Sequence, residues 1–315
     1  PRPPNGWASI SLHPKSSLLD PRRYADGSIH QVFRSLPPVS WQGSFWAVTG
    51  YPEAQEVLGT PDLYSSAYGT GLTSDTRPGL NSLNLSDPPL HTRLRTQVDG
   101  WIRSARPRYQ ADANPIRDLP RQTLMALLQI KEPLARRLQE LAIRVAQHRP
   151  GANQQLLESL RPVACPLDWA AEDQLYLKRL LTLASLESSS AALASLARHR
   201  PDDLEEMLRL HPPIQRLGIH RLREARLGGQ CRQAGPRVVV FFAAANRDPR
   251  VFSEPDQWKT RKIGHLSFGF GPHRCPGRAL AMGQLRHLQA SPPPPPRRFY
   301  ASNFSLTPYE EPISD

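Results

Sequence analysis

The sequence predicts a mainly α-helical single domain with small β-sheets, spanning residues 1–315. The first observation is a long stretch, residues 168–199, whose apolar side chains cover most sides of a helix, as in a buried core helix. The second is a set of shorter helical patterns, of which residues 202–213 end at a proline pair. The third is the shortness of the strand patterns, at residues 45–49 and 227–240. Together they favour helices with only a small share of strand.

The chain is strongly basic. It has 40 Lys and Arg against 28 Asp and Glu, a net charge of +12 and a pI near 10.2. Such a charge is typical of proteins that meet nucleic acid, an anionic membrane or an acidic protein partner. The arginines are spread along the chain and do not form a basic tract with interleaved aromatics, so nucleic acid is not expected as a partner. We expect an acidic protein partner, with most charges on a solvated face.

The cysteines and apolar runs indicate the compartment. Three cysteines, Cys165, Cys231 and Cys275, are an odd number without framework spacing, which argues against a disulfide-stapled secreted protein. The first residues lack the apolar stretch of a signal peptide. The longest apolar run, residues 238–245, is too short to span a bilayer. The expectation is a cytoplasmic monomer without a membrane segment.

The first part of the chain predicts short elements. Residues 45–49 predict a strand, and residues 51–58 a helix with a proline in its first turn. Residues 64–85 are rich in Ser, Gly and Thr and predict a long loop. A capping Asp and two prolines then precede a helix on which His91 and Arg95, four apart, share a face. On residue types alone this face is more often solvated than anion-binding.

The middle of the long core helix is polar, with Ser185, Glu187 and Ser188 close together. Buried polar groups need partners or a function. These residues therefore predict either a functional site inside the helix or a serine-rich patch that contacts a neighbouring helix.

The second half of the chain continues the helical pattern. On the helix of residues 202–213, Glu206 and Arg209 are three apart and can form an ion pair. Residues 227–240 predict a hairpin. Residues 276–289 predict a last helix with one apolar face, which a proline tract then ends.

Cys275 lies in the run of residues 265–278, which reads His-Leu-Ser-Phe-Gly-Phe-Gly-Pro-His-Arg-Cys-Pro-Gly-Arg. The glycines let the backbone turn tightly and approach a flat ligand. Pro276 fits a first helical position, so Cys275 is expected at a helix start, where free N–H groups and the helix dipole lower a cysteine pKa. Arg274 and Arg278 act in the same direction. The run predicts a thiolate offered to a metal; the alternative is a buried structural cysteine.

These residues carry a resemblance to a known family. The heme-binding loop of the cytochrome P-450 family reads Phe-x-x-Gly-x-His/Arg-x-Cys-x-Gly, and every defined position is filled here, by Phe268, Gly271, His273, Cys275 and Gly277. The resemblance implies the cytochrome P-450 fold, with heme b between the long helix and the Cys275 loop. Cys275 is then the axial thiolate of the iron. The resemblance also implies that Phe268, Gly269 and Gly277 belong to the cofactor site.

The same resemblance implies contacts to the heme propionates by His91, Arg95 and His265. The family often has one more arginine before the hairpin. That position falls on Ile219 here, so the resemblance leaves His220 or Arg221 as a substitute.

The resemblance also gives the polar middle of the core helix a role. The family places Ala-Gly-x-Asp/Glu-Thr there, so Glu187 matches the acid, Ser188 the alcohol and Ser185 the glycine, and these three are the implied catalytic residues for proton delivery. Ser188 lacks the methyl group that restricts a threonine rotamer, so proton delivery is expected to be less well aimed.

One further match concerns the core. The resemblance implies that Glu206 and Arg209 are joined by a later arginine, which the spacing places at Arg261 or at the neighbouring Lys262.

The implied function is a heme-thiolate monooxygenase that oxidises a small organic substrate, in bacterial specialised metabolism such as antibiotic biosynthesis. The resemblance implies O2 and electrons from ferredoxin and ferredoxin reductase, and the substrate could be bound to a carrier protein. Two alternatives stay open: an oxidative coupling or peroxide-using enzyme without oxygen insertion, suggested by Ser185 and Ser188, and a non-enzymatic basic binding protein.

Overall fold

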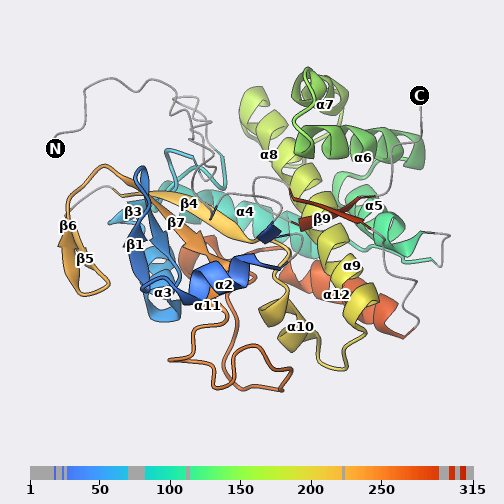
Figure 1. Ribbon diagram of the computed structural model, residues 1–315. Helices are drawn as coiled ribbons and strands as arrows, with labels where there is room; N and C mark the ends of the chain where they lie inside the picture. The colour runs from blue at the N-terminus through green and yellow to red at the C-terminus, as the bar shows by residue number, and fades with distance from the viewer. Residues whose placement is uncertain are drawn as a thin grey trace.

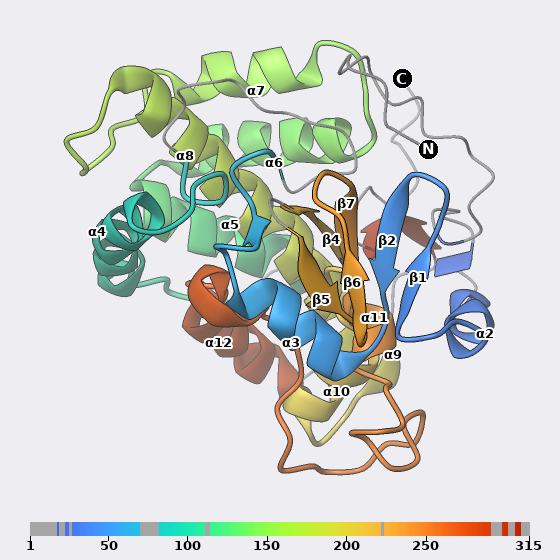
Figure 2. The ribbon, with the colours of Figure 1, turned by 90° about the vertical axis from the view of Figure 1, so that its left-hand side faces the viewer.

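The computed structural model describes residue 18 and residues 23–24, 27–69, 82–110, 114–221, 224–290, 298–301 and 306–309. The main helices are α2 (Ile29–Arg34), α3 (Tyr51–Gly59), α4 (Leu90–Ser104), α5 (Pro115–Leu128), α6 (Glu132–Ala146), α7 (Ala152–Leu160), α8 (Ala171–Leu183), α9 (Ser189–His199), α10 (Leu204–Leu210), α11 (Phe242–Ala245) and α12 (Arg278–Gln289). Most of the longer helices gather on one side of the molecule, whereas the main sheet lies on the other side with α2, α3 and α11 (Figures 1 and 2). The predicted mainly helical fold is confirmed.

The strands form one larger sheet and two hairpins. The sheet has the order β1 (Val39–Trp41), β2 (Phe45–Val48), β7 (Arg237–Phe241), β4 (Arg216–Arg221) and β3 (Tyr64–Ser65), with β2 and β7 parallel and the other neighbours antiparallel. The hairpins are β5 (Ala225–Leu227) with β6 (Gln230–Arg232), and β8 (Arg298–Ala301) with β9 (Leu306–Tyr309). The predicted hairpin over residues 227–240 is therefore divided. Gly228 and Gly229, both at positive φ, turn β5 into β6, and β7 joins the main sheet.

The predicted core helix is continuous from α8 to α9 but contains one turn of π-helix, η2 (Ala184–Ser188). Leu177, Leu193 and Leu196 are buried, and α9 packs against α5, α10 and α12. By length and composition, the helical stretch Ala171–His199 is able to cross a membrane. The longest uninterrupted apolar run, residues 238–245, gave no sign of this. Because 61% of the most apolar window of Ala171–His199 is buried inside the protein, this stretch has the character of a core helix.

A buried ion network fixes α10 to the segment before the cysteine loop. Arg209, with 1% of its side chain exposed, donates to both carboxylate oxygens of Glu206, at 2.7 and 2.8 Å, and to the carbonyl of Asn246 at 2.6 Å. Arg261 Nε donates to Glu206 at 3.2 Å, so the structure selects Arg261 over Lys262. Burial alone would raise the pKa of Glu206, but these hydrogen bonds lower it below its ordinary value. Asn246 Oδ1 also accepts from Leu266 N at 2.7 Å and so ties the network to the loop.

A histidine cluster lies beside this network. The rings of His199 and His211, at the ends of α9 and α10, are stacked with centroids 3.9 Å apart and 13° between their planes. Burial and nearby positive charges, Arg247 among them, lower the pKa of His211 to about 2 and that of His30 to about 3. Asp256 acts in the opposite direction on His30, whereas Arg34 and Arg198 add to the positive charge around the cluster.

Acid is expected to destabilise the fold through this cluster. With folded pKa values below the ordinary 6.5, the unfolded chain binds more protons, so stability is full above that pH and is lost as the pH falls toward the folded values. From pH 7 to 5.5 the free energy of unfolding should drop by about 1 kcal/mol per histidine. Urea unfolding at both pH values measures it. His211→Gln should remove its share of the drop, whereas His148→Gln, at an exposed site, should not; equal pH dependence in both variants would contradict the prediction.

Candidate active site

The cysteine loop folds back on itself before α12. Cys275 N donates to Phe268 O at 2.8 Å, and Gly269 N donates to Leu266 O at 2.8 Å. Gly269 and Gly271 have φ of +72° and +67°, a region that favours glycine. A Cβ on Gly271 would also come within 2.5 Å of Leu58 O in α3, so both conformation and packing require glycine there. The predicted tight turn is confirmed.

The expected helix start at Pro276 is wrong. Pro276 and Gly277 form a turn, and α12 begins at Arg278, because Gly277 has φ −83° and ψ 5°, outside the helical region. A Cβ on Gly277 would lie 3.8 Å from Cys275 Sγ. Cys275 therefore lies outside the helix, and the turn places the first N–H groups of α12 near its sulfur.

The predicted lowering of the Cys275 pKa is also wrong in its net direction. Burial raises the pKa of the thiol, while backbone N–H groups of Gly277 and Arg278, and the charges of Arg95 and Arg274, act against it without cancelling it. The residue nevertheless has an exposed surface. Protein atoms therefore lie around the thiol, while part of the residue stays accessible to a ligand.

This environment fits a heme iron as the partner of the sulfur. A metal ion deprotonates a coordinating thiol outright, because its charge stabilises the thiolate. Within the described residues no group of three His, Cys, Asp or Glu side chains could hold a metal.

His91 and His273 form a pair beside the loop. Their ring centroids are 3.9 Å apart, and His91, on α4, is only 2% exposed. Both ring nitrogens of His91 lack a hydrogen-bond partner, which is rare for buried polar atoms and fits a partner such as a ligand carboxylate. His273 Nε2 lies 3.0 Å from Ser66 Oγ, and burial together with His91 lowers its pKa to about 4.

Arg95 lies one turn after His91 and contacts the loop directly. Its Nη1 donates to the carbonyls of Arg274 at 2.6 Å and Pro272 at 3.2 Å, and its Nε pairs with Asp99 at 2.7 Å. The shared face predicted for His91 and Arg95 is thus directed at the cysteine loop. Their contact with a propionate stays a prediction.

His265 has two protein partners, and its predicted contact with a propionate stays a prediction. Its Nε2 lies 3.0 Å from Glu205 Oε2, and its Nδ1 accepts from Ser267 N at 3.0 Å. Both ring nitrogens are therefore used by the protein, and a propionate contact requires His265 to give up one of these bonds. His273 is the histidine that the structure brings to His91. The match to the heme-binding loop gave His273 only as a motif position. Its place two residues before Cys275 was the signal that could have assigned it to the site.

Arg221 lies at the end of β4, where its backbone pairs with Tyr64 of β3. Its side chain lies outside the described part of the structure, so its contact with a propionate stays a prediction. Ile219, at the position of the family arginine, is buried at 5% exposure.

The three implied catalytic residues meet in the π-helical turn. Ser188 Oγ donates to Ala184 O at 2.7 Å, and Ser185 Oγ donates to Thr182 O at 3.3 Å. Ala184 is exposed, and Ser185, Glu187 and Ser188 are half-buried, although the helix is buried on both sides of the turn. Single π-turns inside helices are frequent at functional sites. Since α9 continues from this turn and packs against α12, which follows Cys275, one helix pair ties the turn to the loop (Figure 1).

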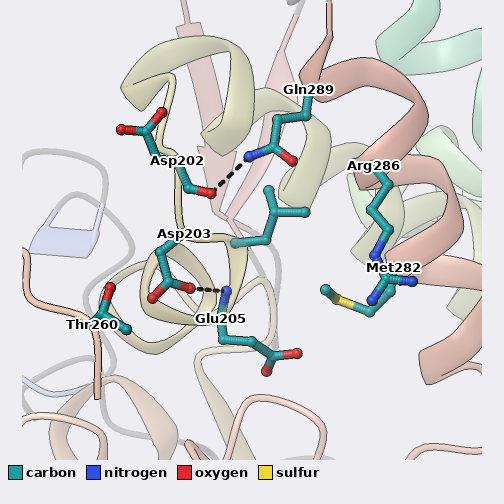
Figure 3. Close-up of a pocket in the computed structure, with 8 residues that line it drawn as sticks. Asp202, Asp203, Glu205, Thr260, Met282, Arg286 and Gln289 are labelled. Atoms are coloured by element: carbon teal, nitrogen blue, oxygen red, sulfur yellow. Dashed lines mark hydrogen bonds between the residues drawn. The ribbon is translucent and has the colours of Figure 1, made fainter. Parts of the chain in front are cut away.

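A separate polar pocket of about 390 Å³ lies between α10 and α12 (Figure 3). It is lined by Asp202, Asp203, Leu204, Glu205, Thr260, Met282, Arg286 and Gln289. Cys275 does not line this pocket.

The chain is similar to known proteins in sequence and in fold. The sequence pattern of the family described as Cytochrome P450 matches residues 203–290, which include α10, the cysteine loop and α12. The linalool 8-monooxygenase of Pseudomonas putida is 25% identical in an alignment that covers 86% of this chain and 90% of that enzyme.

Solved structures share the fold. P450 OxyD, involved in the biosynthesis of vancomycin-type antibiotics, superposes with a TM-score of 0.71 at 19% identity, over 93% of this chain and 99% of that one. A second P450, solved in complex with an acyl carrier protein ligated to hexadec-9Z-enoic acid, gives a TM-score of 0.67 at 20% identity, over 89% and 96%.

Proposed function

As a member of the cytochrome P450 family, this chain is a heme monooxygenase, and we propose that Cys275 is the thiolate that holds its iron. The observation that supports this most is the glycine turn that leaves Cys275 exposed, with the backbone N–H groups of Gly277 and Arg278 favouring its thiolate. When bound, heme supplies the oxidising chemistry, and a thiolate ligand favours O–O cleavage. His91 and His273, with Arg95 behind them, would hold the propionates, and Phe268, Gly269 and Gly277 would shape the proximal side. Arg221 and His265 are further propionate candidates.

A carbon monoxide difference spectrum of the reduced protein tests this proposal. The expected result is the Soret shift that a thiolate ligand produces. Absence of that shift in protein with bound heme would exclude the thiolate role of Cys275. Absence of heme binding altogether would favour the non-enzymatic basic binding protein.

The residues of the π-turn would deliver protons. The Ser188 hydroxyl donates to Ala184 O and can accept a proton from a neighbouring donor through its lone pairs. Glu187, on the same turn, is the acid that would resupply it, and Ser185 would add a second hydroxyl. Because serine has a freer rotamer than threonine, the Ser188 hydroxyl is aimed less tightly than a threonine hydroxyl would be.

Replacing Ser188 with alanine should therefore lower the product formed per O2 consumed, by roughly tenfold, because one positioned proton donor is lost. Ser188→Thr should restore or raise the ratio. Ser190→Ala, at a buried serine of the same helix, serves as the control. An unchanged ratio in Ser188→Ala would remove Ser188 from the relay.

The proposed substrate is a small organic molecule of bacterial specialised metabolism, and its presentation on a carrier protein is the finer form of this proposal. The antibiotic-pathway enzyme and the carrier-protein complex among the similar structures support it, as does the net charge of +12, since carrier proteins are acidic partners. The runner-up is oxidative coupling or peroxide use, favoured by serines at positions 185 and 188. Product formed under isotopically labelled O2 separates them: unlabelled product would exclude direct insertion.

Ferredoxin and ferredoxin reductase are the proposed electron donors, in the cytoplasm. Arg274, beside Cys275, is exposed and available to an acidic partner. Raising salt should slow reduction by ferredoxin because exposed charges are screened. At low salt Arg274→Gln should slow reduction by roughly threefold, whereas Arg144→Gln on α6 should not. A rate that is independent of salt would contradict electrostatic docking.

A further inference from the structure

Glu205, which the family loop does not include, touches both ends of that loop. It lies in the first turn of α10, directly before Glu206 of the buried network. Its Oε2 lies 3.0 Å from His265 Nε2, at the start of the loop. Its Oε1 accepts from Arg278 Nη2, at the start of α12. One carboxylate thus joins the residues that enclose the loop in sequence.

The hydrogen bonds fix the form of His265. Ser267 N donates to Nδ1, so Nδ1 carries no proton and the neutral ring has its proton on Nε2. That proton is donated to Glu205. The side chain of His265 is 5% exposed, whereas that of Glu205 is 47% exposed, so the ring is held from its buried side by the backbone and from its outer side by Glu205.

Phe268 connects the two partners of Glu205 to the cysteine. The guanidinium of Arg278 lies 5.4 Å from the centre of the Phe268 ring, and the His265 ring lies 5.8 Å from it. The carbonyl of Phe268 accepts from Cys275 N at 2.8 Å. Both partners of Glu205, His265 and Arg278, therefore contact the ring of Phe268, whose backbone holds Cys275. A shift of either partner moves the residue that contacts Cys275.

We propose that Glu205 is a positioning residue, which holds the two ends of the cysteine loop together and so keeps the sulfur of Cys275 on the iron. The inference rests on the proposed role of Cys275 as the heme ligand. The proposed role belongs to Glu205 and not to the other two carboxylates that line the same pocket, Asp202 and Asp203. Figure 3 shows Asp203 bonded to the backbone N–H of Glu205, with the Glu205 carboxylate on the far side from Asp203. Asp202 lines the same pocket and offers only its backbone carbonyl, to Gln289 Nε2 at 3.0 Å.

The test compares Glu205→Ala and Glu205→Gln with wild type and with Asp202→Asn, which changes a carboxylate of the same pocket that has no contact with the loop. All four are purified with heme. The carbon monoxide difference spectrum is followed over time at a mildly elevated temperature. The readout is the rate at which the thiolate-type band converts to the band of heme without a thiolate ligand. Heme stoichiometry and circular dichroism are recorded beside it to show whether the fold is intact.

The expected order of conversion rates is wild type and Asp202→Asn slowest, then Glu205→Gln, then Glu205→Ala. Glu205→Ala should convert roughly 3- to 10-fold faster than wild type, because two partly exposed charge-assisted bonds are lost. Glu205→Gln keeps an acceptor for His265 but loses the charge that pairs with Arg278, so it should fall between them. A merely structural role would change circular dichroism and heme content together with the spectrum.

Equal conversion rates in wild type, Glu205→Ala and Asp202→Asn would overturn the inference while leaving Cys275 as the ligand. Equally fast conversion in Asp202→Asn and Glu205→Ala would also overturn it, because the effect would then be one of pocket charge. Absence of a thiolate-type band in wild type would instead overturn the proposed function itself, so the two failures are distinct.

Discussion

Replacing Cys275 with serine is expected to abolish the thiolate-type Soret band and reduce monooxygenase turnover by at least about a hundredfold. A serine hydroxyl at this position is a hard, neutral donor with a far higher pKa than a thiol, so it does not supply the charge that a thiolate gives the iron. The turn around Gly277 and the Phe268 hydrogen bond do not depend on the sulfur, so the loop should keep its backbone conformation. The difference spectrum and product formation measure the two effects.

The other two cysteines provide matched controls. Cys165 is half-buried, and Cys231 is exposed on β6. Serine at either position should leave the Soret band in place. Loss of the band in the Cys165 or Cys231 variant, with retention in Cys275→Ser, would overturn the assignment of the ligand.

Replacing Arg209 with alanine is expected to have the largest effect on stability. It leaves Glu206 buried with only two described donors to its carboxylate, Arg261 Nε and the backbone N–H of Lys259. It also removes the donors to the carbonyls of Asn246 and Pro255. Breaking a buried pair by removing one partner costs about 3–5 kcal/mol. Since whole domains are stable by about 5–15 kcal/mol, little folded protein should remain. Urea unfolding and the yield of soluble protein measure this.

Arg209→Lys keeps the charge but not the two-pronged geometry, so it should fold with a measurable loss. Arg136→Ala is the control, because Arg136 and Glu132 form a pair on the surface of α6, with side chains 59% and 46% exposed. It should change the free energy of unfolding by less than about 0.5 kcal/mol. A loss in Arg209→Ala as small as that of the control would contradict the role of the network.

The elements that the sequence predicted well are those set by local pattern. The core helix, α3, α10 and the turn at Gly271 follow from apolar periodicity, prolines and glycines, which act over a few residues. The ion pair of Glu206 and Arg209 follows equally from spacing on one helix. The π-turn at Ser185 could not be predicted in this way. Its change in backbone hydrogen bonding has no simple sequence pattern and depends on the packing of α5, α6 and α8 around it.

The site was predicted only in part, for reasons of distance along the chain. Pairing of His91 with His273 joins α4 to the cysteine loop, and no local pattern specifies that contact. Motif matching assigned His265 to the cofactor, and that contact stays a prediction; its hydrogen bonds to Glu205 and Ser267 could not be read from the motif. Arg261 could be chosen over Lys262 only after the loop geometry was known. The predicted direction of the Cys275 pKa shift was wrong. The prediction included the nearby charges but not the burial of the thiol by segments distant in sequence.

Asn246 receives Arg209 through its carbonyl and, through its side chain, binds Leu266 N and Ser267 Oγ at 2.7 and 2.9 Å. The segment that leads into the cysteine loop is therefore held by the same residue that completes the buried ion network. A substitution that opens the network also removes support from this segment, so damage to the core reaches the cysteine loop through Asn246.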